Sequence, residues 1–245
     1  MYSKILIANR GAIARRIVRA CHDLSIRSAV VFTEPDQGAP YLSEAGEAHL
    51  IAGRSPVDSY MNTEQLLKVA KEVGADAIHP GYGFLSENAD FAKQVRSAGM
   101  HFIGPSPDWI ERMADKVEAR KLMKSVGVPT FPGSGQITNE KEAREFVLEN
   151  GLPVIVKPSG GGGGIGMKVV FDESELGEAI SNASDMAEKS FSNGSVYLER
   201  WMADSRHIEF QILADLKGNV MHLFERDCSV PVSYTHLTLP TILPV

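Results

Sequence analysis

The chain has 245 residues, of which 25 are lysine or arginine and 31 are aspartate or glutamate, so its net charge is −6. This length allows one large domain or two smaller ones, each with a sizeable core. The mildly acidic balance argues against a protein that coats nucleic acid or an anionic membrane. Since no apolar run approaches the roughly 20 residues of a membrane span, we expect neither nucleic acid nor a membrane as a partner.

Cysteine usage and the first residues predict a cytoplasmic protein. Cys21 and Cys228 share no metal-ligand spacing, which favours a reducing compartment over a disulfide framework. A strand is predicted to begin at Lys4, which leaves no room for a signal or transit peptide.

The start of the chain predicts a β-α-β unit. Residues 4–8 (K-I-L-I-A) form a short buried strand, the turn Asn9-Arg10-Gly11 leads into a helix, and residues 28–33 form the next strand. This order is typical of a parallel, doubly wound, Rossmann-like sheet with a right-handed crossover. The first turn holds one glycine, so a sheet of this plan without a dinucleotide is favoured over a dinucleotide site. The helix residues expected to face the core are Ile13, Ile17, Cys21 and Leu24.

A loop rich in turn formers follows the third predicted strand. Residues 77–79 (A-I-H) form that strand, and residues 80–88 (P-G-Y-G-F-L-S-E-N) form the loop. Open α/β sheets bind ligands at the carboxyl ends of their strands, which is where this loop lies. Two interpretations remain open: Tyr82 and Phe84 are buried plugs of a tight loop, or the loop contacts a ligand directly. The residues expected to begin helices in this part of the chain are Asn62, Asn88 and Asp115.

A domain boundary is predicted near residue 113. A fourth strand over residues 101–103 comes before it, and a helix that starts at Asp115-Lys116 comes after it. From the helical pattern alone, Lys116 is a solvated helix residue. A further helix over residues 138–150 leads to the most unusual stretch of the chain.

That stretch is a strand, a run of glycines and a second strand. Residues 154–159 (V-I-V-K-P-S) enter five consecutive glycines, Gly160 to Gly164, and residues 167–171 (M-K-V-V-F) leave them. Backbone without Cβ atoms can approach a polyphosphate closely and offer several N–H donors, while Lys157 adds positive charge. We interpret the stretch as a phosphate cover. A disordered glycine linker is the alternative, which the apolar strands on both sides disfavour.

Two common nucleotide motifs do not fit this stretch. Gly161, Gly163 and Gly166 formally match G-x-G-x-x-G, but a dinucleotide fingerprint must open a helix and here a strand follows. A Walker A motif needs its lysine after the glycines, whereas Lys157 precedes them.

The segment after the glycines predicts a helix, a strand and a hairpin. Asp172 and Glu175 form a capping-box-like start for a helix to about Lys189, and residues 195–200 form a strand. Residues 207–214 alternate, with a turn over 215–219 and a second strand over 220–225. The alternation predicts that Ile208, Phe210, Ile212 and Ala214 face a core. The opposite face, for which plain solvent exposure and a functional role both remain open, carries His207, Glu209 and Gln211.

Four stretches together resemble a known family. They are I-A-N-R-G at residues 7–11, H-P-G-Y-G-F-L-S-E-N at residues 79–88, K-P-S with its glycines from residue 157, and E-R-D-C-S at residues 225–229. In this order they resemble the N-terminal part of biotin carboxylases. These are the ATP-grasp components of acetyl-CoA, propionyl-CoA, methylcrotonyl-CoA and pyruvate carboxylases. The resemblance covers residues 1–230.

The resemblance implies an α/β fold in two parts and a nucleotide site. Residues 1–113 would be the biotin carboxylase N-terminal (pre-ATP-grasp) domain, and residues 114–230 the first part of an α+β ATP-grasp domain with a glycine-rich lid. It replaces the solvated interpretation of Lys116 with a contact to the nucleotide phosphates, which Lys157 shares. The other nucleotide-binding residues it implies are Gly163 and Gly164 over the phosphates, Glu199, Arg200, Trp201 and Met202 beside adenine, and His207.

The implied chemistry is that of a ligase in acyl-CoA metabolism or fatty acid biosynthesis. ATP and Mg²⁺ activate bicarbonate to carboxyphosphate, and the carboxyl group passes to biotin on a carrier domain. Such a step needs fixed donors for the developing charge and exclusion of water. The implied partners are a biotin carboxyl carrier domain and a carboxyltransferase, with a homo-oligomer for the full-length parent.

Some positions depart from the family pattern. Ala12 stands where glutamate is usual and Ile165 where arginine is frequent. Residues 231–245 contain three prolines and no Asp, Glu, Lys or Arg, where the family carries its bicarbonate-binding groups. We therefore predict that this tail is foreign to the family. Catalytic and metal-binding residues are expected beyond it, so none is assigned within the chain.

Three functional hypotheses follow from the sequence. The first is a biotin carboxylase of which this chain is the N-terminal part, expected to be inactive alone. The second is a nucleotide-binding fragment without turnover. The third is another ATP-grasp ligase, such as half of a carbamoyl-phosphate synthetase, against which the loop over residues 80–88 argues.

Overall fold

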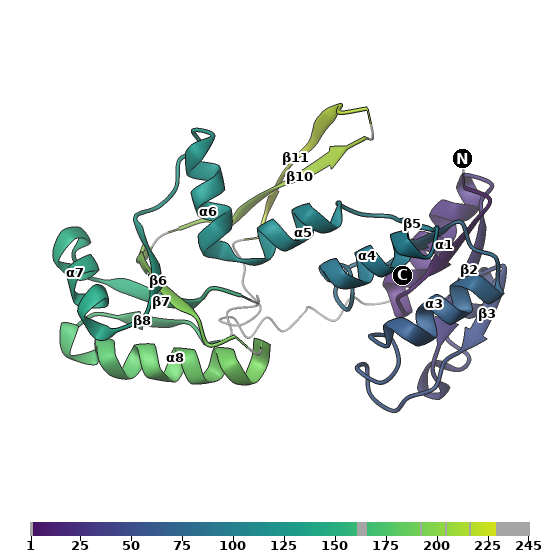
Figure 1. Ribbon diagram of the computed structural model, residues 1–245. Helices are drawn as coiled ribbons and strands as arrows, with labels where there is room; N and C mark the ends of the chain where they lie inside the picture. Colours follow the sequence, from purple (N-terminus) through teal and green to yellow (C-terminus); the bar gives the residue numbers. More distant parts are fainter. Residues whose placement is uncertain (1, 161–165, 192, 204, 216, 229–245) are drawn as a thin grey trace, which may run out of the picture.

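The computed structural model describes residues 2–160, 166–191, 193–203, 205–215 and 217–228. Within them lie a five-stranded sheet, a four-stranded sheet and a two-stranded hairpin (Figure 1). The predictions for Gly163 and Gly164 and for the tail over residues 231–245 lie outside the described residues. No helix in the described part of the chain is both long and apolar enough to cross a membrane.

The first sheet is parallel throughout, with strand order β3-β2-β1-β4-β5. This confirms the predicted doubly wound sheet. Strand β3 was not predicted, because its alternating burial at the sheet edge leaves no continuous apolar run. The strands are β1 (Lys4–Ile7), β2 (Arg27–Phe32), β3 (Glu47–Leu50), β4 (Ala77–His79) and β5 (His101–Phe102).

Helices cover both faces of this sheet. Ile5 and Ile7 of β1 pack with α1 and α2, whereas Leu6 packs with α3, α4 and α5 on the other face. Full burial of one such side chain contributes about 1.5–3 kcal/mol. The helices are α1 (Gly11–Asp23), α2 (Pro40–Glu44), α3 (Thr63–Glu72), α4 (Ala89–Ser97) and α5 (Pro107–Ala114).

The predicted helix starts are confirmed by side-chain caps. Asn62 accepts a hydrogen bond from the Gln65 N–H at 3.1 Å, and Asn88 accepts one from the Phe91 N–H at 2.7 Å. These bonds satisfy N–H groups that have no partner inside the helix. The prediction for Leu24 is wrong: it follows the last residue of α1 and is 60% exposed, because the helix ends before it can reach the core face.

The loop over residues 80–88 is tight, but only one of its two aromatic side chains is a plug. Tyr82 is 73% exposed, so of the two open interpretations the one with both aromatic side chains buried does not hold for Tyr82. Phe84 stacks on the Tyr60 ring with 5.4 Å between centroids, and Leu85 is 2% exposed. Gly81 and Gly83 both have φ near +68°, a conformation that allows the turn to reverse and disfavours side chains.

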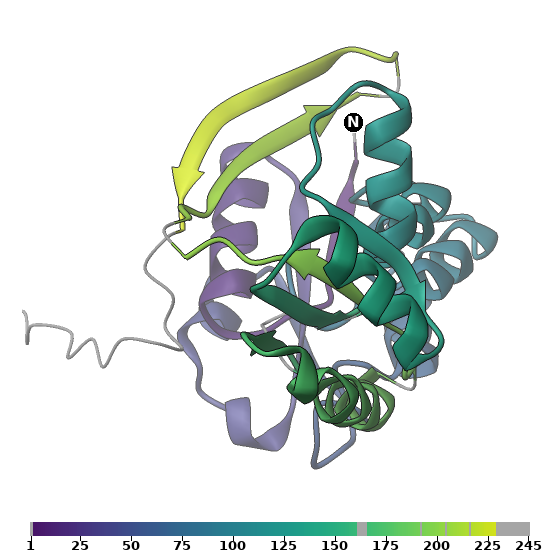
Figure 2. The same cartoon turned by 90° about the vertical axis from the view of Figure 1, so that its left-hand side faces the viewer.

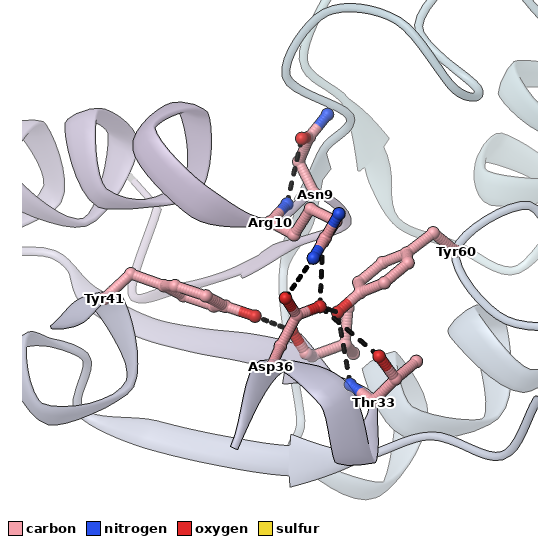
Figure 3. A network of polar contacts seen from close by, with 7 residues as sticks. Asn9, Arg10, Thr33, Asp36, Tyr41 and Tyr60 are labelled. Atoms are coloured by element: carbon pink, nitrogen blue, oxygen red, sulfur yellow. Dashed lines mark hydrogen bonds and ion pairs between the residues drawn. The ribbon is translucent and has the colours of Figure 1, made fainter. Parts of the chain in front are cut away.

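A polar network fills the sheet edge where a dinucleotide fold would bind ribose. Asp36, in the short turn η1 (Glu34–Asp36) after β2, accepts hydrogen bonds from Arg10 Nε at 2.8 Å, the Tyr60 hydroxyl at 2.5 Å and the Thr33 hydroxyl at 3.3 Å (Figure 3). Because this carboxylate is 8% exposed and already shared among protein donors, it is unsuited to hold a ribose. The network therefore supports the interpretation that the Rossmann-like sheet of this chain is not a dinucleotide-binding one.

The second sheet is antiparallel, with strand order β6-β9-β7-β8. Strands β7 and β8 flank the glycines and pair with each other, which confirms the predicted hairpin. Helices α7 and α8 bury one face of the sheet, including Val154, Val156 and Leu198, all 0% exposed. The elements are α6 (Lys116–Ser125), β6 (Gly133–Ile137), α7 (Glu140–Asn150), β7 (Val154–Pro158), β8 (Lys168–Val170), η2 (Glu173–Glu175), α8 (Leu176–Phe191) and β9 (Val196–Arg200).

The last hairpin projects from the rest of the molecule (Figure 2). It consists of β10 (Ile208–Ala214) and β11 (Val220–Asp227), paired antiparallel as predicted. The predicted core contact is wrong: Ile208, Phe210 and Ile212 are 37%, 59% and 53% exposed. Within the described residues β10 pairs only with β11, and the exposure of these side chains shows that the apolar face is left largely uncovered. A register shift between Phe210 and Ile212 also breaks the simple alternation.

Candidate functional site

The register of β7 and β9 brings two predicted site residues together. Lys157 lies opposite Tyr197, and Ile155 lies opposite Glu199. Since side chains alternate along a strand, Lys157 and Glu199 are diagonal neighbours on one face. Lys157 Nζ lies 2.5 Å from Glu199 Oε2. Helices α7 and α8 bury the opposite face, so this polar pair is on the face of the sheet that they leave uncovered.

Helix α6 brings Lys116 to the same place. The N–H of Lys116 donates to the Ser159 carbonyl at 2.9 Å, which ties the first residue of the helix to the end of β7. Asp115 caps the helix by accepting from the N–H groups of Val117 and Glu118 at 2.8 and 3.0 Å, as predicted. Both lysines to which the family resemblance gives a phosphate contact therefore lie beside the start of the glycine run.

Lys116 is in an unusual electrostatic environment. Burial lowers its pKa below the ordinary value, and the positive charge of Lys157 lowers it further. The carboxylates of Asp115, Glu199 and Glu87 oppose the shift. Glu87 comes from the loop over residues 80–88 at the end of β4, so the parallel sheet's own loop contributes to the field at this lysine. Because two neighbouring positive charges repel each other, an anion bound between them is stabilised by both.

A buried hydroxyl lies at the base of the glycine run. Ser159 is 1% exposed, and its Oγ has no hydrogen-bond partner among the described residues. Leaving such a group unpaired costs about 1–3 kcal/mol. A phosphate oxygen would accept its hydrogen bond, so the hydroxyl and the two lysines fit an anionic group at this position.

Arg120 is a member of the site that the sequence analysis missed. It pairs through Nη1 with Glu199 Oε1, and its Nη2 donates to the Phe131 carbonyl at 2.5 Å. Its guanidinium also lies 5.8 Å from the centre of the Tyr197 ring. The available signal was its position one helical turn after Lys116, which places both cations on the same face of α6.

The adenine-side segment predicted at Glu199 to Met202 continues along the sheet edge. The N–H of Arg200 donates to the Pro132 carbonyl at 3.0 Å, and the N–H of Trp201 donates to the Pro153 carbonyl at 3.0 Å. The backbone of the segment is thus held between its neighbours. Trp201 is half-buried and Met202 is 41% exposed, so an apolar surface is available there.

His207 lies in a second cluster, on the hairpin. Its Nε2 is 3.4 Å from Glu209 Oε1, and Glu209 Oε2 accepts from Arg226 Nη2 at 2.7 Å. These residues share the polar face that the alternation predicted. His207 and Arg226 are 65% and 62% exposed, so this face is open to solvent, and its predicted role at a nucleotide stays a prediction.

Two further features lie apart from the lysines. A groove of about 600 Å³ between α6, β6 and α7 is bordered by Arg120, but neither Lys116 nor Lys157 lines it. In the described part of the chain, no group of three or more His, Cys, Asp and Glu side chains is arranged to hold a metal ion.

A parallel sheet domain followed by a glycine hairpin with two converging lysines defines a protein of the ATP-grasp class. Two family models match the chain. One, described as biotin carboxylase, N-terminal domain, matches residues 1–110, and the other, described as carbamoyl-phosphate synthase L chain, ATP binding domain, matches residues 115–239. The chain belongs to the biotin carboxylase family, which confirms the resemblance seen in the four sequence stretches.

Known relatives match nearly the whole chain. Biotin carboxylase of Halalkalibacterium halodurans is 48% identical over 94% of this chain and 51% of that protein. One solved relative is the biotin carboxylase domain of Hydrogenobacter thermophilus 2-oxoglutarate carboxylase, a dimer bound to MgADP, ADP and bicarbonate. It is 46% identical to this chain with a TM-score of 0.89, and the match covers 94% of this chain and 51% of that one. Campylobacter jejuni biotin carboxylase with a β,γ-ATP ligand is 40% identical with a TM-score of 0.91, covering 93% and 51%. The chain therefore spans about half the length of these relatives.

Proposed function

We propose that this chain supplies the N-terminal domain and the ATP-binding region of a biotin carboxylase. In that reaction ATP and Mg²⁺ activate bicarbonate to carboxyphosphate, from which biotin on a carrier domain is carboxylated. The observation that carries the proposal is the convergence of Lys116 and Lys157 at the end of β7, beside the buried Ser159 hydroxyl and the glycine run.

This arrangement suits the charge changes of the reaction. A polyphosphate held near two fixed cations has its negative charge compensated without solvent reorganisation. Glycine backbone can approach the phosphates and offer N–H donors. Closure of such a cover excludes water, which protects an intermediate as easily hydrolysed as carboxyphosphate.

The residue roles are part of the proposal. Lys116 and Lys157 contact the phosphates, Gly163 and Gly164 lie over them, and His207 reaches the nucleotide from the hairpin. The segment over residues 199–202 lies beside adenine, where half-buried Trp201 and exposed Met202 offer an apolar surface. The ATP analogue and the MgADP and bicarbonate bound by the two solved relatives support ATP, Mg²⁺ and bicarbonate as ligands of the whole protein.

The domain division and the partners are proposed on the same basis. Residues 1–113 form the N-terminal domain, residues 114–230 the start of the ATP-grasp domain, and residues 231–245 a tail foreign to the family, although the match to the ATP-binding model extends to residue 239. A carrier domain and a carboxyltransferase are the partners, and the solved dimer of the Hydrogenobacter thermophilus domain supports a homo-oligomer. Two unpaired cysteines, Cys21 and Cys228, support the cytoplasm as the compartment.

A chimera tests the activity. Residues 1–228 are joined to the remaining part of the Halalkalibacterium halodurans biotin carboxylase, and ATP hydrolysis is measured with Mg²⁺, bicarbonate and free biotin. We expect hydrolysis that requires bicarbonate and rises with biotin. The 245-residue chain alone is measured beside it, and we expect ATP binding without this turnover.

A second candidate function is synthesis of carbamoyl phosphate. The match of residues 115–239 to the carbamoyl-phosphate synthase model favours it, and the two reactions share bicarbonate activation by ATP. The same chimera separates them when ammonia replaces biotin. Hydrolysis that ignores biotin and rises with ammonia would contradict the biotin carboxylase proposal.

A further inference from the structure

Glu199 is shared by two cations from different elements. Its Oε1 pairs with Arg120 Nη1 on α6, and its Oε2 pairs with Lys157 Nζ on β7. The three side chains are 16%, 20% and 26% exposed for Glu199, Arg120 and Lys157. A partly buried group of this kind is screened less by solvent and salt than a surface pair, so its charge balance matters to a ligand nearby.

The structure holds Arg120 in place from several directions. Its Nη2 donates to the Phe131 carbonyl at 2.5 Å, and its guanidinium lies over Tyr197. A Cβ atom on Gly133 would overlap the same guanidinium, so glycine at that position makes room for it. The planar guanidinium makes the two bonds from two different nitrogen atoms held in a fixed geometry, which the single nitrogen of a lysine ammonium does not reproduce.

The charge count explains why a second cation is needed. With Lys157 as its only partner, the Glu199 carboxylate would neutralise the lysine and leave no net charge for a phosphate. Arg120 supplies a separate positive charge to the other carboxylate oxygen, so the three groups together carry a net charge of +1. Lys116, whose field overlaps that of Lys157 and Glu199, adds to this potential.

We propose that Arg120 is a positioning residue: by compensating Glu199, it leaves the charge of Lys157 available to the polyphosphate of a nucleoside triphosphate, while Glu199 keeps Lys157 in place. The inference rests on the proposed function of this site and extends it to a residue outside the predicted nucleotide contacts. The alternative is that Arg120 only clamps α6 to the sheet.

Ligand titrations of three variants separate these roles. Binding to the 245-residue chain is measured by calorimetry at low ionic strength, with inorganic tripolyphosphate and ATP as probes and adenosine as the probe without phosphates. The variants are Arg120→Met, the double variant Arg120→Met/Glu199→Gln, and Arg120→Lys. The matched control is Arg144→Met, because Arg144 on α7 also pairs with two carboxylates, Glu140 of α7 and Glu173 of η2, but on the exposed surface.

We expect Arg120→Met to weaken binding of tripolyphosphate and ATP about threefold to fivefold, as loss of one nearby charge does. The double variant removes the uncompensated carboxylate as well and restores tripolyphosphate binding to within about twofold of the parent. Arg120→Lys retains the charge and most of the affinity. Adenosine binding by Arg120→Met and all binding by Arg144→Met remain unchanged.

A clamp alone predicts a different pattern. The double variant would then bind tripolyphosphate no better than Arg120→Met, and that result overturns the inference. Two other results also overturn it: normal tripolyphosphate binding by Arg120→Met, and no tripolyphosphate binding by the parent. The melting curve of Arg120→Met shows whether this variant folds. If it does not, tripolyphosphate binding by Arg120→Lys is compared with binding by the parent and by Glu199→Gln. Loss of tripolyphosphate binding in Arg120→Lys then contradicts the inference. Biotin-independent hydrolysis by the chimera would defeat the proposed function and leave these binding results standing.

Discussion

Asn9 and Pro80 join two sequence stretches that are far apart in the chain. The Asn9 side-chain amide donates to the Pro80 carbonyl at 2.8 Å and to the Tyr82 carbonyl at 3.0 Å. Asn9 is fully buried. The I-A-N-R-G stretch at the end of β1 thus fixes the shape of the loop over residues 80–88, whose Glu87 acts on Lys116.

We expect Asn9→Ala to destabilise the protein by about 1–3 kcal/mol, because two carbonyl groups lose a buried donor. The free energy of unfolding from urea denaturation measures this. The matched control is Asn182→Ala, which removes an exposed asparagine from α8 and should change stability little. Equal effects of the two substitutions would show that Asn9 does not hold the loop.

Gly81 and Gly83 provide a controlled comparison within that loop. Both have φ near +68°, so alanine is strained by backbone conformation at either position. A Cβ on Gly81 would also lie 2.6 Å from Asn9 Nδ2 and 2.7 Å from Ile13 Cγ2, whereas nothing lies within 4 Å of one on Gly83.

We therefore expect Gly83→Ala to cost about 1–2 kcal/mol from conformation alone. Gly81→Ala should cost more, by at least about 1 kcal/mol, because Asn9 and Ile13 must move. Thermal and urea unfolding of both variants give the difference. If the two alanines cost the same, the close contact between Gly81 and Asn9 carries no energetic weight.

Local patterns predicted more of the fold than of the site. The caps at Asn62 and Asn88 and the hairpin around the glycines depend on neighbouring residues, so the sequence was sufficient for them. The pairing of Lys157 with Glu199 depends on the register of β7 and β9, which are separated by a whole helix, and no local pattern fixes that register.

Where sequence patterns failed, the cause was tertiary context. Alternation predicts that one face of β10 is apolar, but it cannot say whether anything covers that face, and Phe210 is 59% exposed. Arg120 looks like any charged residue on an amphipathic helix, because its partners Glu199 and Phe131 come from other elements. The resemblance assigned both lysines to the phosphates, Lys157 through its own motif, whereas Arg120 became visible only in the contacts.

The pH dependence of stability should report on Asp36. Burial alone would raise the pKa of this carboxyl, but hydrogen bonds from Arg10, Tyr60 and Thr33 outweigh it and lower the pKa below its ordinary value of 3.8. A carboxyl with a lowered native pKa contributes stability above the unfolded value. That stability is lost as the pH falls through the native pKa.

We expect the melting temperature of the parent to fall as the pH drops from about 4 towards the lowered pKa of Asp36. Asp36→Asn should be less stable at neutral pH and should lose less on acidification, since its side chain no longer titrates. Melting curves of both proteins across this range give the difference attributable to Asp36. Parallel pH profiles would mean that Asp36 has the same proton affinity in the folded and unfolded chain.

Anion binding should titrate with Lys116 at a lower pH than an ordinary lysine would give. Burial, and after it the charge of Lys157, lower the Lys116 pKa below its ordinary value of 10.5. As the pH rises through this lowered pKa the site loses a positive charge, so tripolyphosphate affinity falls before the ordinary lysine range is reached. Lys116→Arg keeps its charge at alkaline pH and should abolish this early decline.

The same shift predicts proton uptake on binding. A bound polyphosphate favours the charged form of Lys116 and raises its pKa, so at a pH near the lowered pKa of the free chain each binding event draws a fraction of a proton from solution. Calorimetric titrations in two buffers with different ionisation enthalpies measure that fraction, and Lys116→Arg is the control in which it should vanish. Identical heats in both buffers for the parent chain would place the polyphosphate away from Lys116, even if it binds.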